Sequence, residues 1–197
     1  MNQENLGIQS YKNSQEMSVE GQLAQSLRTA PIPEGQILEN LGLFMTSKNL
    51  SRLLFMHHIY EMILPVPGVV MDFGTRWGQN LAMFSAIRGI YEPFNRHRKL
   101  IGFDTFSGFP SVVSQDGASS MMRKNNVSVT DKYEDYLERL MQVHEALNPI
   151  SHIKKFEIVA GDATKTVPKY LVDNPHTIIA LAYFDFDIYE PTKICLE

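Results

Sequence analysis

Four short apolar segments alternate with amphipathic segments along the last two-thirds of the chain, and this alternation predicts the fold. The apolar segments cover residues 69–73, 99–104, 155–160 and 177–186. Each is apolar on both faces, a pattern typical of strands buried in a parallel sheet. Between them, apolar residues recur at helical spacing over residues 79–90, 131–147 and 166–172. This order predicts an α/β fold with a doubly wound, mostly parallel, Rossmann-like sheet.

The segment before the first strand divides into a polar arm and a helical part. Residues 1–35 are rich in Gln, Asn, Ser and Glu, which predicts a flexible arm, with a short helix around residues 21–27 as the alternative. Residues 36–67 predict a helical cap whose main helix has Ser47 as its N-cap and ends at the turn 65–68. Residues 68–197 then form the ligand-binding domain.

Two residues set the expected starts of later helices. Thr130 is a candidate N-cap for the helix 131–147, which carries Asp and Glu early, as the helix dipole favours. Pro168 is expected in the first turn of the helix 166–172, where its missing N–H costs nothing.

Composition narrows the class of protein. The chain has 197 residues, with 18 Lys and Arg against 22 Asp and Glu, so its formal net charge is −4. With 44% hydrophobic residues it can bury a full core, and its mild acidity argues against a general nucleic-acid or membrane-surface binder. A single cysteine, Cys195, excludes an intrachain disulfide and fits a reducing compartment. Because no segment approaches ~20 consecutive apolar residues and the N-terminus lacks a signal-peptide core, we expect a soluble, cytoplasmic protein.

Acidic residues stand at the end of every predicted strand. They are Asp72, Asp104, Asp162 and the pair Asp185 and Asp187. Since the carboxyl ends of parallel strands meet at one edge of the sheet, where such folds bind ligands, we expect these side chains to surround one site.

The glycine pattern at this edge excludes the common phosphate-binding loops. The chain has D-x-G-x-x-x-G at Asp72–Gly78 but neither G-x-G-x-x-G nor G-x-x-x-x-G-K-[ST]. A ligand without phosphates that carries a ribose, an adenine and an amino-acid end suits the acids better, and S-adenosylmethionine has those groups. Gly74 and Gly78 would permit a tight turn and close approach of the ligand. The helix that begins near Gly78 would face a carboxylate, Asp104 would accept the ribose hydroxyls, and Asp162 an exocyclic amine.

Four motifs in order give a family resemblance. They are GVVMDFGTRWGQN at 68–80, GFDTFSGFP at 102–110, GDA at 161–163 and FDFDIYEPT at 184–192. With these motifs the stretch from about Leu43 to Glu197 resembles class I S-adenosylmethionine-dependent methyltransferases. More narrowly, it is similar to the macrocin O-methyltransferase family, which methylates sugar hydroxyls on antibiotics.

The resemblance implies a set of site residues and a reaction. The implied cofactor residues are Asp72, Gly74, Thr75, Arg76, Trp77, Gly78, Asn80, Asp104, Thr105, Phe106, Gly161, Asp162, Ala163 and Asp185. Residues 72–78 would hold the methionine end, Asp104 the ribose, and Asp162 with Ala163 the adenine. Asp185, with Asp187 beside it, would bind Mg²⁺, which favours the alkoxide of a sugar hydroxyl. The implied partner is a sugar or glycosylated small-molecule acceptor.

Several residues keep a second interpretation. Asp162 could cap a helix, Trp77 could be a packing residue, and Asp185 and Asp187 could repel each other at a wet strand end. His57 and His144 are weak candidates for a base, and no base is assigned. Residues 107–126 form a long loop that is a candidate lid.

The resembled fold also sets expectations about completeness and assembly. Its sheet has seven strands, so we expect either that the sequence is a piece of a longer chain or that a partner supplies the rest. The polar arm predicts a homo-oligomer. Two rival functions stay open, namely a cephalosporin-hydroxylase-like enzyme of the same fold and a non-catalytic cofactor-binding module.

Overall fold

A computed structural model describes residues 12–197 of the chain. Its contacts divide the chain into a smaller unit that ends at Phe55 and a larger unit that begins at Met56. The boundary lies within one helix, α2 (Ser47–Ile63). The candidate site belongs entirely to the larger unit.

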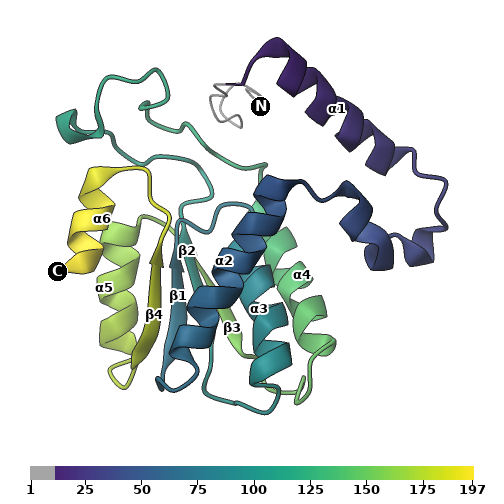
Figure 1. Cartoon of the computed structure of the whole chain (residues 1–197). Coiled ribbons are helices and arrows are strands. Elements are labelled where there is room, and N and C mark those ends of the chain that lie inside the picture. The colour runs from purple at the N-terminus through teal and green to yellow at the C-terminus, as the bar shows by residue number, and fades with distance from the viewer. Residues whose placement is uncertain (1–11) are drawn as a thin grey trace. The chain divides into compact units, whose positions relative to one another are not determined.

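The larger unit is built on a parallel sheet (Figure 1). The strands are β1 (Val69–Phe73), β2 (Leu100–Asp104), β3 (Phe156–Ala160) and β4 (Ile179–Phe184), in the order β3-β2-β1-β4. Phe73 is aligned with Phe103 on one side and with Phe184 on the other. The carboxyl ends are therefore level, and the loops that follow the strands leave from one edge of the sheet. The doubly wound α/β fold expected from the sequence is confirmed.

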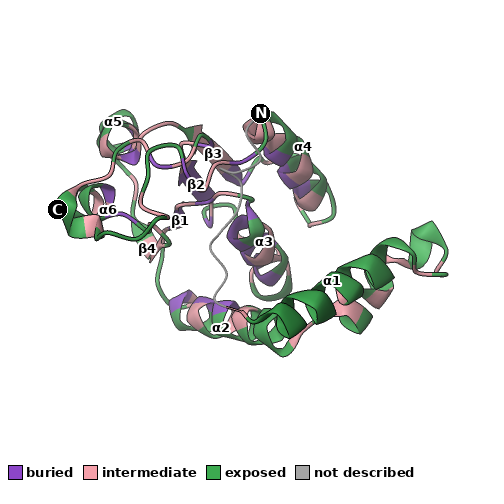
Figure 2. Cartoon of the chain, turned by 90° about the horizontal axis from the view of Figure 1, so that it is seen from above, coloured by how far each residue is buried: buried purple, intermediate pink, exposed green. Residues whose placement is uncertain are grey.

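Helices cover both faces of the sheet, as Figures 1 and 2 show. The elements are α3 (Gln79–Tyr91), α4 (Tyr133–Ala146), α5 (Ala163–Asp173) and α6 (Tyr189–Leu196), with a short 3-10 turn η4 (Ser114–Asp116) in the loop before α4. Apolar residues of α3 and α4 pack on one face together with the part of α2 that follows Phe55. Apolar residues of α5 pack on the opposite face, with Cys195 of α6 beside them.

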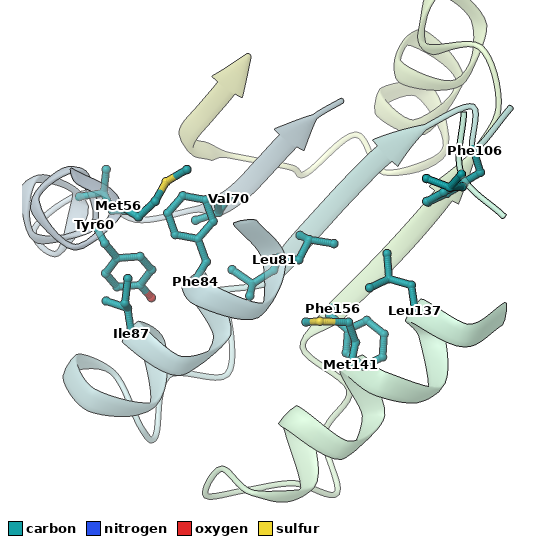
Figure 3. Close-up of a cluster of buried hydrophobic side chains, with 13 residues drawn as sticks. Met56, Tyr60, Val70, Leu81, Phe84, Ile87, Phe106, Leu137, Met141 and Phe156 are labelled. Atoms are coloured by element: carbon teal, nitrogen blue, oxygen red, sulfur yellow. The ribbon is translucent and has the colours of Figure 1, made fainter. Parts of the chain in front are cut away.

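The first of these clusters is the larger core (Figure 3). Met56 and Tyr60 of α2 meet Phe84 of α3, and all three are fully buried. Phe156 of β3 and Met141 of α4 extend the same cluster along the sheet. Burying a side chain of this size contributes roughly 1.5–3 kcal/mol, so the cluster fixes the helices on which the site depends.

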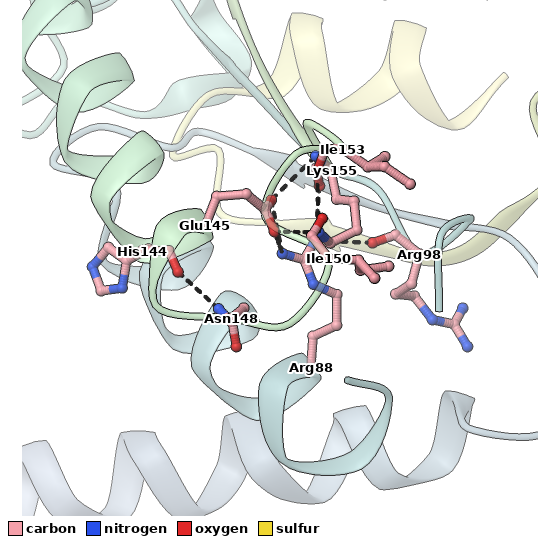
Figure 4. A network of polar contacts seen from close by, with 8 residues as sticks. All are labelled: Arg88, Arg98, His144, Glu145, Asn148, Ile150, Ile153 and Lys155. Atoms are coloured by element: carbon pink, nitrogen blue, oxygen red, sulfur yellow. Dashed lines mark hydrogen bonds and ion pairs between the residues drawn. The ribbon is translucent and has the colours of Figure 1, made fainter. Parts of the chain in front are cut away.

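A buried ionic network closes the opposite end of the sheet (Figure 4). The carboxylate of Glu145 accepts two bonds from Arg88, at 2.9 and 3.0 Å, and pairs with Lys155 at 2.6 Å. Arg88 also donates to the backbone carbonyl groups of Arg98 and Lys155, which precede β2 and β3. The network therefore ties α3 and α4 to the amino ends of two strands.

Three helix boundaries differ from those expected. Helix α4 begins at Tyr133 after an N-cap, Lys132, in the left-handed conformation (φ 57°), so Thr130 is not its cap. Helix α5 begins at Ala163, and Pro168 consequently lies in its interior rather than in its first turn. Helix α2 begins at Ser47, and the hydroxyl of Thr46 rather than Ser47 caps it by accepting the N–H of Asn49.

The smaller unit contains α1 (Ser14–Arg28) and two 3-10 turns, η2 (Glu34–Gln36) and η3 (Leu38–Phe44). Helix α1 is longer than the helix at residues 21–27 that was the alternative prediction, because Asn13 and Glu16 form a reciprocal capping box at its start. None of the residues in these three elements is buried. Residues 12–197 include no helix of the length and apolar character needed to cross a membrane.

Candidate functional site

A pocket opens at the carboxyl edge of the sheet, among the loops that follow all four strands. It holds about 580 Å³ of space free of protein atoms, including solvent at its open side. Its lining residues are Gly74, Arg76, Asp104, Thr105, Gly108, Phe109, Pro110, Val127, Gly161, Asp162, Ala163, Asp185, Phe186, Asp187, Ile188 and Pro191.

Asp104 at the end of β2 organises three of these loops. Its carboxylate accepts the backbone N–H of Arg76 at 2.8 Å and of Phe106 at 2.7 Å, and its carbonyl accepts the N–H of Gly161 at 2.8 Å. Arg76 and Phe106 both have positive φ, 46° and 54°, which non-glycine residues rarely adopt. Such strained turns persist where the surroundings hold them, and they cluster at functional sites. Burial raises the pKa of Asp104, although the two N–H donors and the Arg76 charge oppose that shift.

Gly74 supplies the close approach between β1 and the loop after β4. Its φ is +91°, and a Cβ at this position would lie 2.6 Å from the backbone oxygen of Asp185. The N–H of Asp185 in turn donates to the carbonyl of Phe73 at 2.8 Å. Only glycine satisfies both the backbone conformation and the space, so this residue type is required by the geometry.

Asp72 lies beneath the pocket rather than in its wall. Its side chain is fully buried and accepts the side-chain amide of Asn80 at 3.0 Å. The same amide donates to Asp185 at 3.4 Å, so Asn80 connects the ends of β1 and β4. Burial raises the pKa of Asp72 to about 7, and the nearby carboxylates of Asp185 and Asp104 contribute. Asp72 and Asn80 were expected among the cofactor residues, and the structure places them behind that wall.

Asp162 caps a helix and also lines the pocket, while its contact with an adenine stays a prediction. Its Oδ1 caps α5 by accepting the N–H of Thr164 at 3.1 Å and the Thr164 hydroxyl at 2.7 Å. The residue also lines the pocket, together with Gly161 and Ala163 on either side. The cap therefore fixes a carboxylate at the pocket wall above β3.

Asp185 and Asp187 give the pocket a negative side, next to Arg76. Partial desolvation and the neighbouring charge of Asp185 raise the pKa of Asp187, while Arg76 opposes that shift. Both residues line the pocket. Among residues 12–197, however, no three His, Cys, Asp or Glu side chains come together as a metal cluster. Two carboxylates fit Mg²⁺ only in part, because the other positions of its octahedron would fall to water and substrate.

The long loop after β2 contributes pocket residues that the sequence analysis did not select. Phe109 and Asn126 lie opposite each other, since the N–H of Phe109 donates to the carbonyl of Asn126 at 3.0 Å. Val127 follows with φ 61°, a strained conformation for a β-branched residue, and lines the pocket. The loop also meets the segment after β4, where the N–H of Tyr189 donates to Asp116 at 2.6 Å. Apolar loop residues have no periodic pattern, and only the motif around Phe109 could have identified this wall.

Some predicted residues support the pocket without lining it. Phe106 is buried, and the hydroxyl of Thr75 donates to the carbonyl of Asp72 at 3.1 Å. Gly78 is the left-handed N-cap of α3, with φ 76°. Trp77 packs edge to face against Tyr133, at 4.8 Å between ring centroids and 89° between planes. Trp77 is therefore a packing residue in this structure and does not line the pocket.

Neither candidate histidine lies at the pocket. The Nε2 of His57 lies 2.7 Å from the hydroxyl of Tyr91, and His57 Nδ1 lies 3.5 Å from Glu61. His144 is in the last turn of α4, where burial lowers its pKa and its carbonyl accepts the Asn148 amide. Neither residue is among those that line the pocket.

Solved structures relate this fold to enzymes. A crystal structure of CalS11, a calicheamicin methyltransferase, matches 95% of this chain and 73% of its own, with a TM-score of 0.92 and 40% sequence identity. An apo structure of CalS11, described as a TDP-rhamnose 3′-O-methyltransferase of calicheamicin biosynthesis, covers the same shares with a TM-score of 0.81 and 38% identity. No protein-family model and no curated protein matches the chain.

These similarities span nearly the whole chain and most of each enzyme. The narrower resemblance to the macrocin O-methyltransferases stays a prediction, because the descriptions of the two structures do not name that family. An identity of 40% over a shared fold shows more than architecture. The chain belongs to the family of O-methyltransferases that includes CalS11.

Proposed function

We propose that this chain is an S-adenosylmethionine-dependent O-methyltransferase that acts on a sugar hydroxyl of a natural product or glycoconjugate, assisted by Mg²⁺. The observation that carries the proposal is Asp104, held by two backbone N–H groups at the centre of a pocket bordered by Gly74 and Asp162. Family membership supplies the reaction class, and the pocket supplies groups that match the cofactor.

The residues of the pocket fit the three parts of S-adenosylmethionine. Asp104 keeps lone pairs for ribose hydroxyls after accepting two N–H bonds, since a carboxylate has about four acceptor positions. The Asp162 carboxylate and the apolar Ala163 would border the adenine. Gly74, which has no room for a Cβ, lets the methionine end lie against the backbone between β1 and β4. When bound, the cofactor supplies an electrophilic methyl group.

The remaining residues would position and activate the acceptor. A sugar hydroxyl placed between Asp185 and Asp187 would donate a hydrogen bond to a carboxylate oxygen, which increases the electron density on the attacking oxygen. When no cation is bound, the raised pKa of Asp187 makes its carboxylate a better proton acceptor than an ordinary one. Phe109 and Val127, both at the pocket, would exclude water from the reacting groups.

Mg²⁺ belongs to the proposal through the same two carboxylates. Asp185 and Asp187 would contribute two oxygen ligands, and water with the acceptor hydroxyl would complete the coordination. The metal would lower the pKa of the hydroxyl and orient it. If the carboxylates work in this way, replacing Asp187 by Asn lowers the affinity for Mg²⁺ without changing the affinity for the cofactor.

Assembly and compartment complete the proposal. The elements before Phe55 bury no residue, which favours a homo-oligomer in which another copy covers them. The single cysteine favours the cytoplasm. Analytical ultracentrifugation of the chain tests the first point, since a monomer at micromolar concentration contradicts it.

The direct test of the reaction is transfer of a labelled methyl group. The chain, S-adenosylmethionine carrying a labelled methyl group, Mg²⁺ and rhamnose-containing acceptors are incubated, and the product is analysed by mass spectrometry. We expect a mass increase of one methyl on the sugar and its loss in Asp104→Ala. A chain that binds the cofactor yet transfers no methyl group to any sugar acceptor would favour the non-catalytic module.

A further inference from the structure

A second hollow lies beside the turn of residues 74–78, which joins β1 to α3, and two tyrosines of α4 line it. It is lined by Tyr133 and Tyr136 together with the charged side chains Asp131, Lys132, Asp135 and Arg139. The two rings lie 5.4 Å apart at 44°, and the Tyr136 side chain is half exposed. Large exposed aromatic surface beside polar groups is typical of ligand contact.

The hollow is attached directly to the loop that forms the proposed cofactor site. The hydroxyl of Tyr133 donates to the carbonyl of Trp77 at 3.1 Å, and the ring of Trp77 meets Tyr133 edge to face. On the other side, the guanidinium of Arg76 lies 5.6 Å from the centroid of the Trp77 ring, and Arg76 also lines the pocket. The chain Arg76–Trp77–Tyr133 therefore connects the two cavities.

The position of α4 against this loop is fixed. Gly78 approaches Leu137 so closely that a Cβ on it would lie 2.3 Å from a Leu137 methyl carbon, and Leu137 is fully buried. Tyr133, one turn earlier on α4, and Tyr136, the residue before Leu137, are thus held at a constant distance from the turn of residues 74–78. A ligand in the hollow would meet a preformed surface, which reduces the entropy cost of binding.

The charges of the hollow indicate the chemistry of its ligand. Two cations, Lys132 and Arg139, stand against two anions, Asp131 and Asp135, so the lining charges cancel. This balance disfavours a diphosphate, which needs a surplus of positive charge. A neutral sugar ring suits it, because its hydroxyls need both donors and acceptors and its C–H faces stack on aromatic rings.

We propose that the hollow at Tyr133 and Tyr136 is a second binding site, which holds one sugar ring of an acceptor that carries at least two, while the ring with the reacting hydroxyl lies in the methyl-transfer pocket. The inference rests on the proposed function, because it takes the acceptor to be a sugar. It assigns Tyr136 as the stacking surface and Trp77 as the residue that joins the two sites.

The chain offers a direct probe of this site, because Trp77 is its single tryptophan. Intrinsic fluorescence of the full chain is titrated with methyl α-rhamnopyranoside in one experiment and with thymidine diphosphate in another. The first compound is a neutral sugar ring, and the second is a charged diphosphate without a hexose ring. We expect the rhamnoside to change the Trp77 emission saturably and thymidine diphosphate not to compete with it.

Variants separate stacking from general effects. Tyr136→Ala should weaken rhamnoside binding about tenfold, the factor that corresponds to ~1.4 kcal/mol, and Tyr136→Phe should keep it within about twofold because the ring remains. Phe94→Ala removes an aromatic ring of 73% exposure from the loop between α3 and β2, and it should leave the affinity unchanged.

Two results would overturn the proposal. The first result is that Tyr136→Ala and Phe94→Ala bind the rhamnoside with equal affinity, or that neither variant binds it. The other is a saturable response to thymidine diphosphate that Tyr136→Ala removes, which would make the hollow a nucleotide site. Calorimetry with S-adenosylhomocysteine on the same samples separates the two claims, because binding of this compound without rhamnoside binding leaves the proposed function standing and rejects only the second site.

Discussion

Replacing Asp104 by Asn separates ligand binding from folding at the centre of the site. The carboxylate accepts N–H bonds from Arg76 and Phe106, and the asparagine keeps one oxygen while turning an N–H₂ group toward the other donor. A lost bond to a charged group costs about 1.5–3 kcal/mol. Burial of the carboxylate raises its pKa, which shows that burying its charge is unfavourable. The neutral amide of asparagine removes this cost, and the gain in stability offsets part of the lost hydrogen bond. We therefore expect the free energy of unfolding at pH 7 to change by only about 1 kcal/mol.

The effect on binding should be much larger than the effect on folding. A ribose hydroxyl that loses its charged acceptor loses about 1.5–3 kcal/mol, which weakens binding roughly 10- to 150-fold. Isothermal titration calorimetry with S-adenosylhomocysteine measures the affinity, and urea unfolding followed by circular dichroism measures the stability. An unchanged affinity in a folded Asp104→Asn variant would refute the assignment of Asp104 to the ribose. A stability loss above about 3 kcal/mol would refute the claim that the two effects on folding offset each other.

Three further predictions concern the frame around the site. Glu145→Ala removes the anion that pairs with two buried cations and should lower the free energy of unfolding in urea by about 3–5 kcal/mol. Glu138→Ala on the same helix removes only a surface ion pair and should lower it by less than about 1 kcal/mol. Equal losses in the two variants would contradict a stabilising role of the buried network. Because the pKa of Asp72 is raised to about 7, the folded state keeps a proton that the unfolded state releases above about pH 4. Stability should therefore fall by roughly 4 kcal/mol as the pH rises from about 4 to 7. Asp72→Asn should flatten this dependence in unfolding measured at pH 5 and pH 8, and an unchanged slope would show that another group titrates. Gly74→Ala should abolish S-adenosylhomocysteine binding, because the added Cβ would lie 2.6 Å from the backbone oxygen of Asp185. Gly117→Ala, also at positive φ but with nothing within 4 Å of the added Cβ, should keep this binding. Binding by both variants would reject the close approach between β1 and the loop after β4.

The sheet was predictable from the sequence because its strands are apolar on both faces. Val69–Phe73 and the three other strands are each bounded by a turn signal and an acidic residue, and their parallel order follows from the helices between them. Helix starts were less predictable. Lys132 in the left-handed conformation is the N-cap of α4, and Pro168 lies inside α5, against local preference in both places. Packing against the sheet overrides such preferences.

The site was predictable as far as acids and glycines at strand ends mark it. Gly74, Asp104, Asp162 and Asp185 all line the pocket. Asp72 was expected there as well but does not line the pocket. The sequence around it does not distinguish an acid that points under the loop from one that points into the cavity. The apolar wall around Val127 comes from a loop whose course depends on hydrogen bonds distant in sequence, and a linear pattern does not contain them.

The central claim is that the pocket at the carboxyl edge of the sheet binds S-adenosylmethionine, and a crystal structure with S-adenosylhomocysteine tests it most directly. The account predicts the ribose hydroxyls within hydrogen-bond distance of Asp104, the adenine beside Asp162 and Ala163, and the sulfur facing Asp185. A ligand bound elsewhere on the molecule, or a ribose that makes no contact with Asp104, would contradict it.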